Sequence, residues 1–353
     1  MNDILQKLQE ESSQRLTDSP RETFIEKKKK EFAIDASIDY PDPEYLIEMG
    51  GTPTLPKGNL VALSAKWKNG KTFFCDILTA IFLGCDRFTG CHPMVESGKV
   101  LFFDTEQAVS DTARILKTIH AMTGEQRHDD VAVYCLRNAG IDSGDCADDE
   151  ISRFDFISQT IAHDHPDLVI IDGIADLIYN YNDVIESQEV VNKLAAIANE
   201  NNCCIVVVMH QNKGSRDKNM KGHLGTLLFQ KCSDVFNVEK CGTIFIATHA
   251  VSRHRNCGDF VFKLGEDAIP EDGSGERQQQ LEAKRNQERN KLIEQISQCL
   301  EDATVALKRS DIIGLIKEKL ELGTTRAYQL FNAAEAAGAL VTNDKLHYFL
   351  KTK

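Results

Sequence analysis

Short apolar runs alternate with longer helical stretches between Lys57 and about Leu264. The runs are rich in β-branched residues and lie at 59–65, 98–106, 131–136, 167–172 and 203–210. Continuous apolar strands separated by helices are typical of a parallel sheet that is covered on both faces. Three further runs after Val235 follow one another without helices, and we expect them to add an antiparallel or mixed edge. The pattern therefore predicts an α/β fold with a mostly parallel sheet.

The 353 residues are enough for more than one domain. We expect an N-terminal helical arm or linker over 1–45, the α/β domain over 46–265 and a polar linker over 266–280. Residues 281–353 have the pattern of a winged helix-turn-helix domain, with three helices and two short strands. The lysine run 27–30 in the arm is typical of a solvated helix face, and the alternative is an arm that docks on a neighbouring subunit.

Charge and cysteine content bear on the compartment and the partners. The first thirty residues are charged and contain only short apolar runs, so we expect no signal peptide, no membrane span and a cytoplasmic protein. The eleven cysteines are scattered without a C-x-x-C pair, which indicates buried reduced thiols and gives no support to a zinc site. The net charge of −13 argues against a surface coated in positive charge, although a local basic cluster remains compatible with it.

The stretch SAKWKNGKTFF (64–74) ends like a phosphate-binding loop, directly after a buried strand and directly before a helix. Backbone N–H groups of such a loop and of the helix N-terminus wrap phosphates. We expect Lys71 to reach the β- and γ-phosphates of ATP and Thr72 to hold Mg²⁺, while Gly70 lets the backbone approach closely. Ala65 replaces the glycine that usually opens the loop, and alanine is tolerated there if φ stays negative. The predicted ATP-binding residues are Ala65, Lys66, Trp67, Lys68, Asn69, Gly70, Lys71, Thr72 and Phe73.

An apolar strand that ends in an acid, DLVIID (167–172), follows about 100 residues after the loop. Such a strand presents a carboxylate, here Asp172, to the shell of the Mg²⁺ ion. Gly173 follows, so no glutamate beside Asp172 is available as the catalytic base. Glu106, at the end of the next strand after the loop, is placed to orient the attacking water. Alternatively, Glu106 is an acid at a helix N-terminus, where its negative charge interacts favourably with the helix dipole. We prefer the role of catalytic base.

A catalytic glutamate in that position resembles the RecA fold, and several stretches resemble its hexameric-helicase branch, the RepA-like and DnaB-like ATPases. The resemblance covers about residues 45–265 and implies a RecA-like P-loop NTPase core, to which the winged helix-turn-helix module is added. VVMHQNKG resembles the strand-end motif whose polar residue senses the γ-phosphate, with His210 and Gln211 as candidates.

The stretch ATHAVSRHRNCGDFVFKL resembles the K-x-R-N-G segment that these ATPases insert into the site of the adjacent subunit. The resemblance implies that Arg255 is the arginine finger and that Arg253 takes the place of the lysine. Cys257 replaces the glycine of the segment, and Gly258 comes one residue later. The alternative for both arginines is a solvated hairpin turn. If they are fingers, the protein is a homo-oligomer, expected to be a hexameric ring, with ATP sites between subunits.

In this family the loops after the Asp172 strand and after the sensor strand face the centre of the ring. The first loop has Tyr179, Asn180 and Tyr181, and the second has one acid, Asp217. The second also carries the candidate DNA-binding cations Lys213, Arg216, Lys218 and Lys221. Cations that track phosphates beside aromatic rings that stack on bases are typical of single-stranded DNA binding, and the alternative is a flexible solvated loop.

The C-terminal module offers a second contact. Arg326 lies near the front of the last predicted helix, where a side chain can enter a major groove of duplex DNA. Winged helices also dock on proteins, and the sequence leaves both partners open.

These features together predict an ATP-hydrolysing oligomeric DNA-binding motor. The resemblance implies a RepA-like replicative helicase of a plasmid, phage or mobile element, with ATP and Mg²⁺ as cofactors. The main alternative is an ATP-switched DNA-binding regulator or loader without unwinding activity. A recombinase-like filament would need an N-terminal polymerisation motif that residues 1–40 do not clearly supply, and a degenerate scaffold rests only on Ala65.

Overall fold

The computed structural model describes residues 23–40, 42–124, 129–141, 151–214, 217–253, 255–301, 305–342 and 346–350. The chain divides into two units, Met1–Pro43 and Glu44–Lys353. In the first unit, helix α2 (Phe24–Phe32) begins at a capping box, in which Thr23 and Glu26 each accept a hydrogen bond from the other's backbone N–H. The first part of the predicted arm, 1–22, lies outside the described residues. None of the helices in the described segments is long and apolar enough to cross a membrane.

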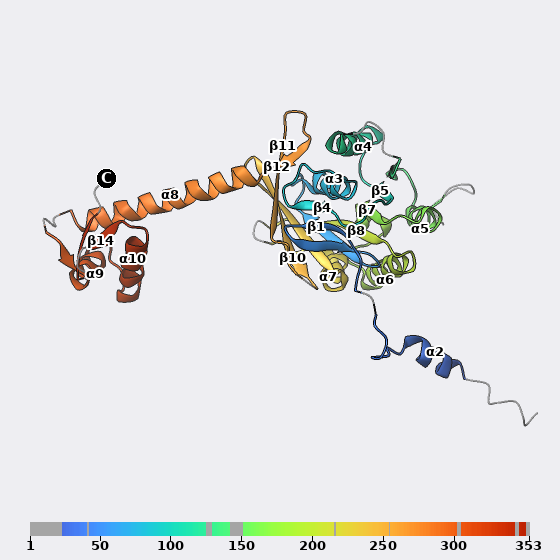
Figure 1. Cartoon of the computed structure of the whole chain (residues 1–353), viewed down its shortest axis with the longest axis horizontal. Coiled ribbons are helices and arrows are strands. Elements are labelled where there is room, and N and C mark those ends of the chain that lie inside the picture. Colours follow the sequence, from blue (N-terminus) through green and yellow to red (C-terminus); the bar gives the residue numbers. More distant parts are fainter. Residues whose placement is uncertain are drawn as a thin grey trace, which may run out of the picture. The chain divides into compact units, whose positions relative to one another are not determined.

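A nine-stranded sheet organises the second unit, in the order β12-β11-β10-β9-β3-β8-β7-β5-β6 (Figure 1). Its strands are β3 (Leu60–Ala65), β5 (Val100–Asp104), β6 (Val131–Cys135), β7 (Leu168–Asp172), β8 (Cys204–His210), β9 (Asp234–Cys241), β10 (Ile244–Ser252), β11 (Asp259–Leu264) and β12 (Pro270–Asp272). Strands β6, β5, β7, β8, β3 and β9 pair in parallel, whereas β10, β11 and β12 add an antiparallel edge. The mostly parallel sheet is confirmed, and its strand order fits a RecA-like core.

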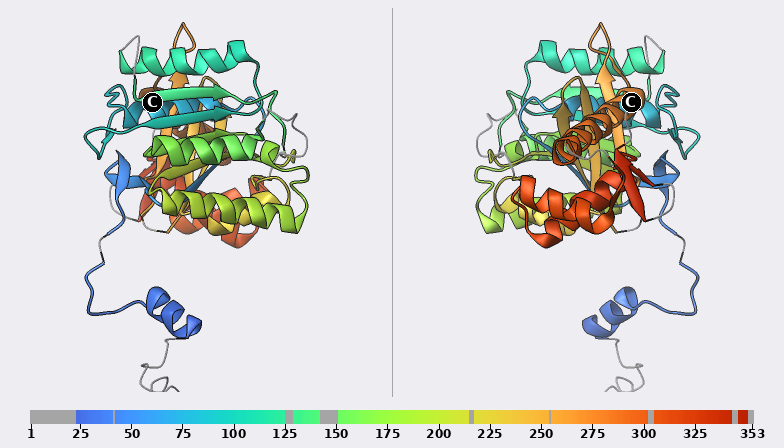
Figure 2. Two further views of the ribbon diagram at one scale, coloured as in Figure 1. Left: turned by 90° about the vertical axis from the view of Figure 1, so that its right-hand side faces the viewer. Right: turned by 90° about the vertical axis from the view of Figure 1, so that its left-hand side faces the viewer.

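Helices cover both faces of the sheet, so it has two cores (Figure 2). The helices are α3 (Lys71–Phe82), α4 (Val109–Thr123), α5 (Arg153–Asp164), α6 (Val184–Glu200) and α7 (Gly222–Lys231), with a short 3₁₀ turn, η2 (Ile174–Leu177). Alternate residues of a strand point to opposite faces, so Val61 and Leu63 join the core under α3 and α4. Leu60 and Ala62 join the core under α5, α6 and α7. Both faces are therefore apolar, as the continuous apolar runs predict.

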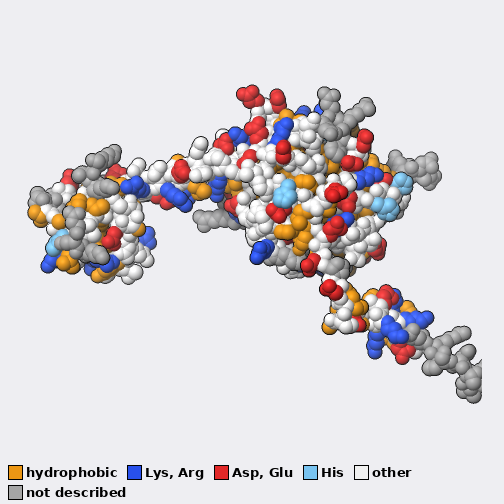
Figure 3. Space-filling model, in the orientation of Figure 1, with side chains coloured by type: hydrophobic (Ala, Val, Ile, Leu, Met, Phe, Trp, Pro, Cys, Tyr) orange, Lys and Arg blue, Asp and Glu red, His pale blue; other side chains and the backbone are white. Residues whose placement is uncertain are grey.

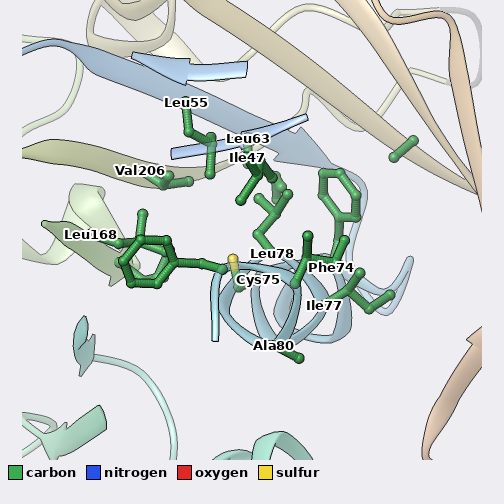
Figure 4. Packing of buried hydrophobic residues seen from close by; sticks show 14 of the residues in the cluster. Ile47, Leu55, Leu63, Phe74, Cys75, Ile77, Leu78, Ala80, Leu168 and Val206 are labelled. Atoms are coloured by element: carbon green, nitrogen blue, oxygen red, sulfur yellow. The ribbon is translucent and has the colours of Figure 1, made fainter. Parts of the chain in front are cut away.

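A small antiparallel sheet, β2-β1-β4, covers the apolar side of α3. It consists of β1 (Tyr45–Met49), β2 (Thr52–Pro56) and β4 (Cys91–Pro93). Figure 4 shows Ile47 and Leu55 from this sheet facing Phe74 and Leu78 of α3. The apolar runs of the sequence do not predict this sheet, although Gly50 and Gly51, both at positive φ between β1 and β2, are a typical two-residue hairpin signal.

Residues 266–280, expected to be a polar linker, form β12 and the first turns of α8 (Ser274–Cys299) instead. A turn at Gly265, whose N–H donates to the carbonyl of Ile269 at 2.9 Å, returns the chain along β11. The Asp272 carboxylate then accepts the N–H of Ser274 at 2.8 Å at the start of α8. The polar composition thus belongs to an exposed edge strand and an exposed helix.

The C-terminal segment has its own apolar core. It contains α9 (Arg309–Lys319), α10 (Thr324–Ala336), the end of α8 and a three-stranded antiparallel sheet of β13 (Leu307–Lys308), β15 (His347–Leu350) and β14 (Leu340–Thr342). Ile296 of α8, Ile312 of α9 and Phe331 of α10 are fully buried together. The predicted composition of three helices and short strands is therefore present.

Candidate nucleotide site

The predicted phosphate-binding loop is the turn between β3 and α3. Ala65 is the last residue of β3, is fully buried, does not adopt a positive φ, and its carbonyl accepts the N–H of Gln211 at 3.0 Å. The positive φ values of the turn belong to Lys68 (57°) and Gly70 (81°). A Cβ atom at Gly70 would lie 2.7 Å from Cδ1 of the Phe245 ring. Glycine is therefore needed directly before the loop lysine and not at the opening of the loop.

Thr72 and Asp172 meet at the floor of the loop. The Thr72 hydroxyl donates to Oδ2 of Asp172 at 2.6 Å. Burial raises the pKa of Asp172 to about 6, and the charges of Asp104 and Glu106 add to this rise. A hydroxyl and a carboxylate are hard oxygen ligands, and a buried carboxylate among like charges is stabilised by a cation. The pair fits Mg²⁺, which with water and phosphate oxygens would neutralise charge on the transferred phosphoryl group.

His210 joins the loop lysine to the predicted base. Its Nδ1 accepts from Nζ of Lys71 at 3.2 Å, and its Nε2 lies 3.3 Å from Oε1 of Glu106. A neutral ring that carries its proton on Nε2 satisfies both neighbours. The hydrogen bond from His210 lowers the pKa of Glu106, and burial lowers the pKa of Lys71. Glu106 is therefore a carboxylate at neutral pH, which is the form that a base requires.

The turn after β5 holds Glu106 in this position. The Asp104 carboxylate accepts the N–H groups of Glu106 and Gln107, each at 3.0 Å, and the hydroxyl of Thr112 at 2.6 Å. Helix α4 begins at Val109, and the acid in its first turn is Asp111. Glu106 thus lies before the helix, with its carboxylate beside His210.

A cavity of about 390 Å³ opens over the loop and is within the size range of small-molecule sites. Residues 67–73 line it, with Glu106, Asp172 and His210 around the expected phosphate end. It continues beyond them along α4, where the lining includes Asp111, Arg114 and Thr118, and along α3, where it includes Asp76. These four residues lie outside the sequence motifs and are not among the predicted site residues. A charged residue in the otherwise apolar stretch FFCDIL was the available signal for Asp76.

Two of the predicted residues, Lys66 and Gln211, lie beside this cavity and do not line it. Gln211 directs its amide to Ser64, with Nε2 donating to Oγ at 3.0 Å, and it borders a smaller hollow together with Lys66 and Asn69. The structure thus places His210, and not Gln211, between Lys71 and Glu106. A catalytic role for Gln211 stays a prediction.

The predicted finger residues lie on the turn between β10 and β11. Arg253 and Arg255 are both exposed, and one guanidinium nitrogen of Arg253 donates to the carbonyl of Lys231 at 2.9 Å. The Arg255 side chain has no hydrogen bond or ion pair within the described part of the chain. Neither arginine lines the cavity of its own subunit.

A buried pair supports this turn from below. Nε2 of His249 lies 2.8 Å from Oδ1 of Asp234, and both side chains are almost fully buried. Nδ1 of His249 accepts the N–H of Cys257 at 3.1 Å. Asn256 donates its side-chain amide to the His249 carbonyl and accepts the N–H of Gly258 at 2.7 Å. The turn that carries Arg255 is therefore tied to the sheet by hydrogen bonds.

The two loops predicted to bind DNA pack against each other. The Tyr181 carbonyl accepts the N–H of Leu224 at 3.0 Å, and Nζ of Lys221 lies 4.6 Å from the centre of the Tyr181 ring. Lys213 is exposed, whereas Lys218 is paired at 2.7 Å with Glu239 of β9. The loop itself contains one acid, Asp217, and the fold brings a second acid, Glu239, next to these cations. Arg216 lies outside the described residues.

Arg326 lies exposed on the first turn of α10, as its predicted contact requires. Arg309 at the start of α9 covers part of the same helix: it donates to Oδ1 of Asn332 at 2.6 Å, and its guanidinium lies 5.9 Å from the centre of the Tyr328 ring.

Comparison with known proteins places this site in a family. A solved structure whose title describes it as an "ATPase Domain" is similar at 13% identity with a TM-score of 0.44, over 60% of this chain and 84% of that one. No curated protein sequence matches the chain. The profile of the family described as "AAA domain" matches residues 27–216, which is more than half of the chain and includes the phosphate loop, Glu106, Asp172 and His210. The chain is a P-loop ATPase that belongs to the AAA domain family.

Proposed function

We propose that the protein is an oligomeric ATP-driven motor that acts on single-stranded DNA, of the RepA-like replicative helicase type. One observation carries this: His210 contacts both Lys71 and Glu106, and the basic loop, residues 212–225, begins two residues later. A change at the γ-phosphate that moves His210 is therefore passed directly to Lys213 and its neighbours. A plasmid, phage or mobile-element setting follows only from the resemblance of the motifs.

The two packed loops supply the DNA contact. Tyr179 is 58% exposed, and Tyr179 and Lys213 lie in loops that follow the neighbouring parallel strands β7 and β8, so an aromatic ring and a cation lie at the same edge of the sheet. Bases stack on such rings while cations follow the phosphates. Acidic side chains are spread over the visible face of the second unit, with Lys and Arg along the exposed part of α8 (Figure 3). DNA binding therefore depends on local clusters and not on net charge.

Lys213→Ala is expected to weaken single-stranded DNA binding and to reduce the slope of log affinity against log salt by about 0.7, because one phosphate contact is lost. Fluorescence anisotropy of a labelled oligonucleotide across salt concentrations measures both. Lys193→Ala, on α6 and paired at 3.6 Å with Glu189, is the matched control and should leave the slope unchanged. Equal slopes for the two variants would exclude Lys213 from the DNA path.

ATP hydrolysis is completed, on this proposal, by the β10–β11 turn of a neighbouring subunit. Arg255 supplies the finger, and Arg253 stands in the position of the lysine. The ring is expected to be a hexamer, with every ATP site between two subunits. The exposed Trp67 at the loop tip then faces the same boundary, since its side chain is 73% exposed and also lines the cavity.

Asn256→Ala is expected to slow ATP hydrolysis about tenfold, because the Arg255 turn loses two of its hydrogen bonds, while the free energy of unfolding falls by only about 1 kcal/mol. Steady-state hydrolysis and urea denaturation test the two effects. Asn201→Ala removes a comparable bond, from Nδ2 to the Ile197 carbonyl at 2.9 Å, at the end of α6 and outside the turn, and should leave hydrolysis intact. Similar rates for both variants would contradict a role of the turn in catalysis.

The C-terminal segment is proposed to be a winged helix in which α10 presents Arg326 to duplex DNA or to a protein. Its three helices and three-stranded sheet support this. The domain would then start at about residue 281, although α8 itself begins earlier.

The decisive experiment measures ATP hydrolysis across protein concentrations, with and without single-stranded DNA, followed by strand separation on a forked duplex. Steep concentration dependence, DNA stimulation and unwinding support the motor. Concentration dependence with DNA binding but no unwinding supports the alternative, a nucleotide-switched regulator or loader. The pairing of Lys218 with Glu239 favours that alternative, because it leaves fewer cations for DNA. Hydrolysis that is independent of both concentration and DNA overturns both.

A further inference from the structure

A polar stripe runs inward along α3 from the Thr72 hydroxyl. Thr72, Asp76 and Thr79 are spaced i, i+4 and i+7, so they share one face of the helix. The other residues from Phe74 to Phe82 are apolar and buried in the core. The Asp76 carboxyl and the Thr79 hydroxyl, which follow the predicted metal ligand Thr72 on this face, are therefore the two polar groups in an otherwise apolar part of the helix.

Asp76 is buried without a matching donor. Its relative exposure is 2%, and its Oδ1 has no hydrogen-bond partner among the described residues. The hydroxyl of Thr79 is likewise without a partner in this part of the chain. Buried polar atoms are normally satisfied, so a partnerless carboxylate oxygen points to a group that the protein alone does not supply.

Asp76 belongs to the wall of the nucleotide cavity. Asp76 lines that cavity together with Thr72 and Asp172. Asp172 and Asp104 are close enough for their charges to raise its pKa, after the larger effect of burial. Three carboxyl groups thus lie near one another beside a site that must also accept a polyphosphate.

We infer that Asp76 is an outer ligand of the divalent cation, accepting hydrogen bonds from water molecules bound to a cation at Thr72 and Asp172. Mg²⁺ retains several waters when bound in proteins, and these waters donate to carboxylates. Asp76 orients the hydrated cation and does not touch the nucleotide. The inference rests on the nucleotide and cation site of the ATPase and is independent of DNA, ring formation and the arginine finger.

The test is Asp76→Asn, which keeps the shape of the side chain and removes its charge. Trp67 is the only tryptophan and lines the cavity, so its emission reports binding of a non-hydrolysable ATP analogue during Mg²⁺ titration. Electron paramagnetic resonance of Mn²⁺ reports the metal directly. We expect the cation concentration for half-saturation to rise about tenfold or more, in line with the loss of other outer-shell partners. Metal-free binding of the analogue should be unchanged or tighter.

Asp111→Asn is the matched control, because Asp111 lines the same cavity from α4 and carries the same charge. Thermal denaturation without metal checks folding, and Asp76→Ser provides a second variant if Asp76→Asn is unstable. An unchanged half-saturation in the folded variants overturns the inference, and so does an equal rise for the Asp76 and Asp111 variants, which would reveal a general charge effect. If neither Mg²⁺ nor Mn²⁺ changes the binding of the analogue to the wild-type protein, the cation site itself is refuted.

Discussion

Arg255→Ala is expected to lower kcat for ATP hydrolysis about 10³- to 10⁵-fold, while nucleotide binding is retained. An arginine that reaches the γ-phosphate from a neighbouring subunit stabilises charge that develops only in the transition state. The exposed Arg255 side chain lies on a turn held by His249 and Asn256 and does not line the cavity of its own subunit. Steady-state hydrolysis and the Trp67 signal measure the two effects separately.

Mixing experiments show whether this arginine acts between subunits. Arg255→Ala has an intact Glu106, and Glu106→Gln has an intact Arg255. Composite sites in a mixture of the two therefore contain both groups, and activity should return although each variant alone is inactive. Arg277→Ala, which removes a partly exposed arginine of α8, serves as the control. Normal hydrolysis by Arg255→Ala would refute the finger, and a slow variant that no mixture rescues would place its effect within one subunit.

Glu106→Gln is expected to reduce kcat about 10²- to 10⁴-fold, because an amide cannot take a proton from the attacking water. The amide has almost the same shape and can still accept from Nε2 of His210, so the link to Lys71 should survive. Binding of ATP, followed by Trp67 emission, should remain close to that of the wild type. Single-turnover hydrolysis isolates the chemical step.

The alternative role of Glu106, an acid at a helix N-terminus, makes a different prediction. Loss of that charge would change the free energy of unfolding by about 0.3–1 kcal/mol and leave kcat unaffected. Asp111→Asn is the comparison for this role, since Asp111 is the acid in the first turn of α4. A slow but stable Glu106→Gln beside a fully active Asp111→Asn supports the base, and the opposite pattern excludes it.

Local patterns were sufficient for most of the central sheet. Strands β3, β5, β6, β7 and β8 are each a short apolar run followed by a helical stretch, and these signals depend on neighbours in sequence. The small β2-β1-β4 sheet was missed because its strands are short and β4 comes from a distant segment. The 266–280 segment was misjudged because an exposed edge strand and a solvated helix have the composition of a linker.

For the site, the sequence predicts the residues within motifs but not the contacts between elements. Lys71, Thr72 and Asp172 were predicted together, and the fold brings them together. The contact of Phe245 with Gly70 joins residues 175 positions apart, as 245 − 70 gives, and no local pattern marks it. The choice between His210 and Gln211 likewise depends on which side chain β8 turns toward the cavity.

Strand β10 is constrained at both of its ends. Phe245 near its beginning lies against the phosphate loop of its own subunit, and the Arg255 turn follows directly after its end. Nine residues of extended chain, about 30 Å, separate the contact with one nucleotide loop from the group proposed to act on the next. On the proposed arrangement, a substitution that shifts this strand would therefore first disturb the order in which successive subunits hydrolyse ATP, before it disturbed either site alone. Substitutions in β10 would then be limited by two nucleotide sites and not by one.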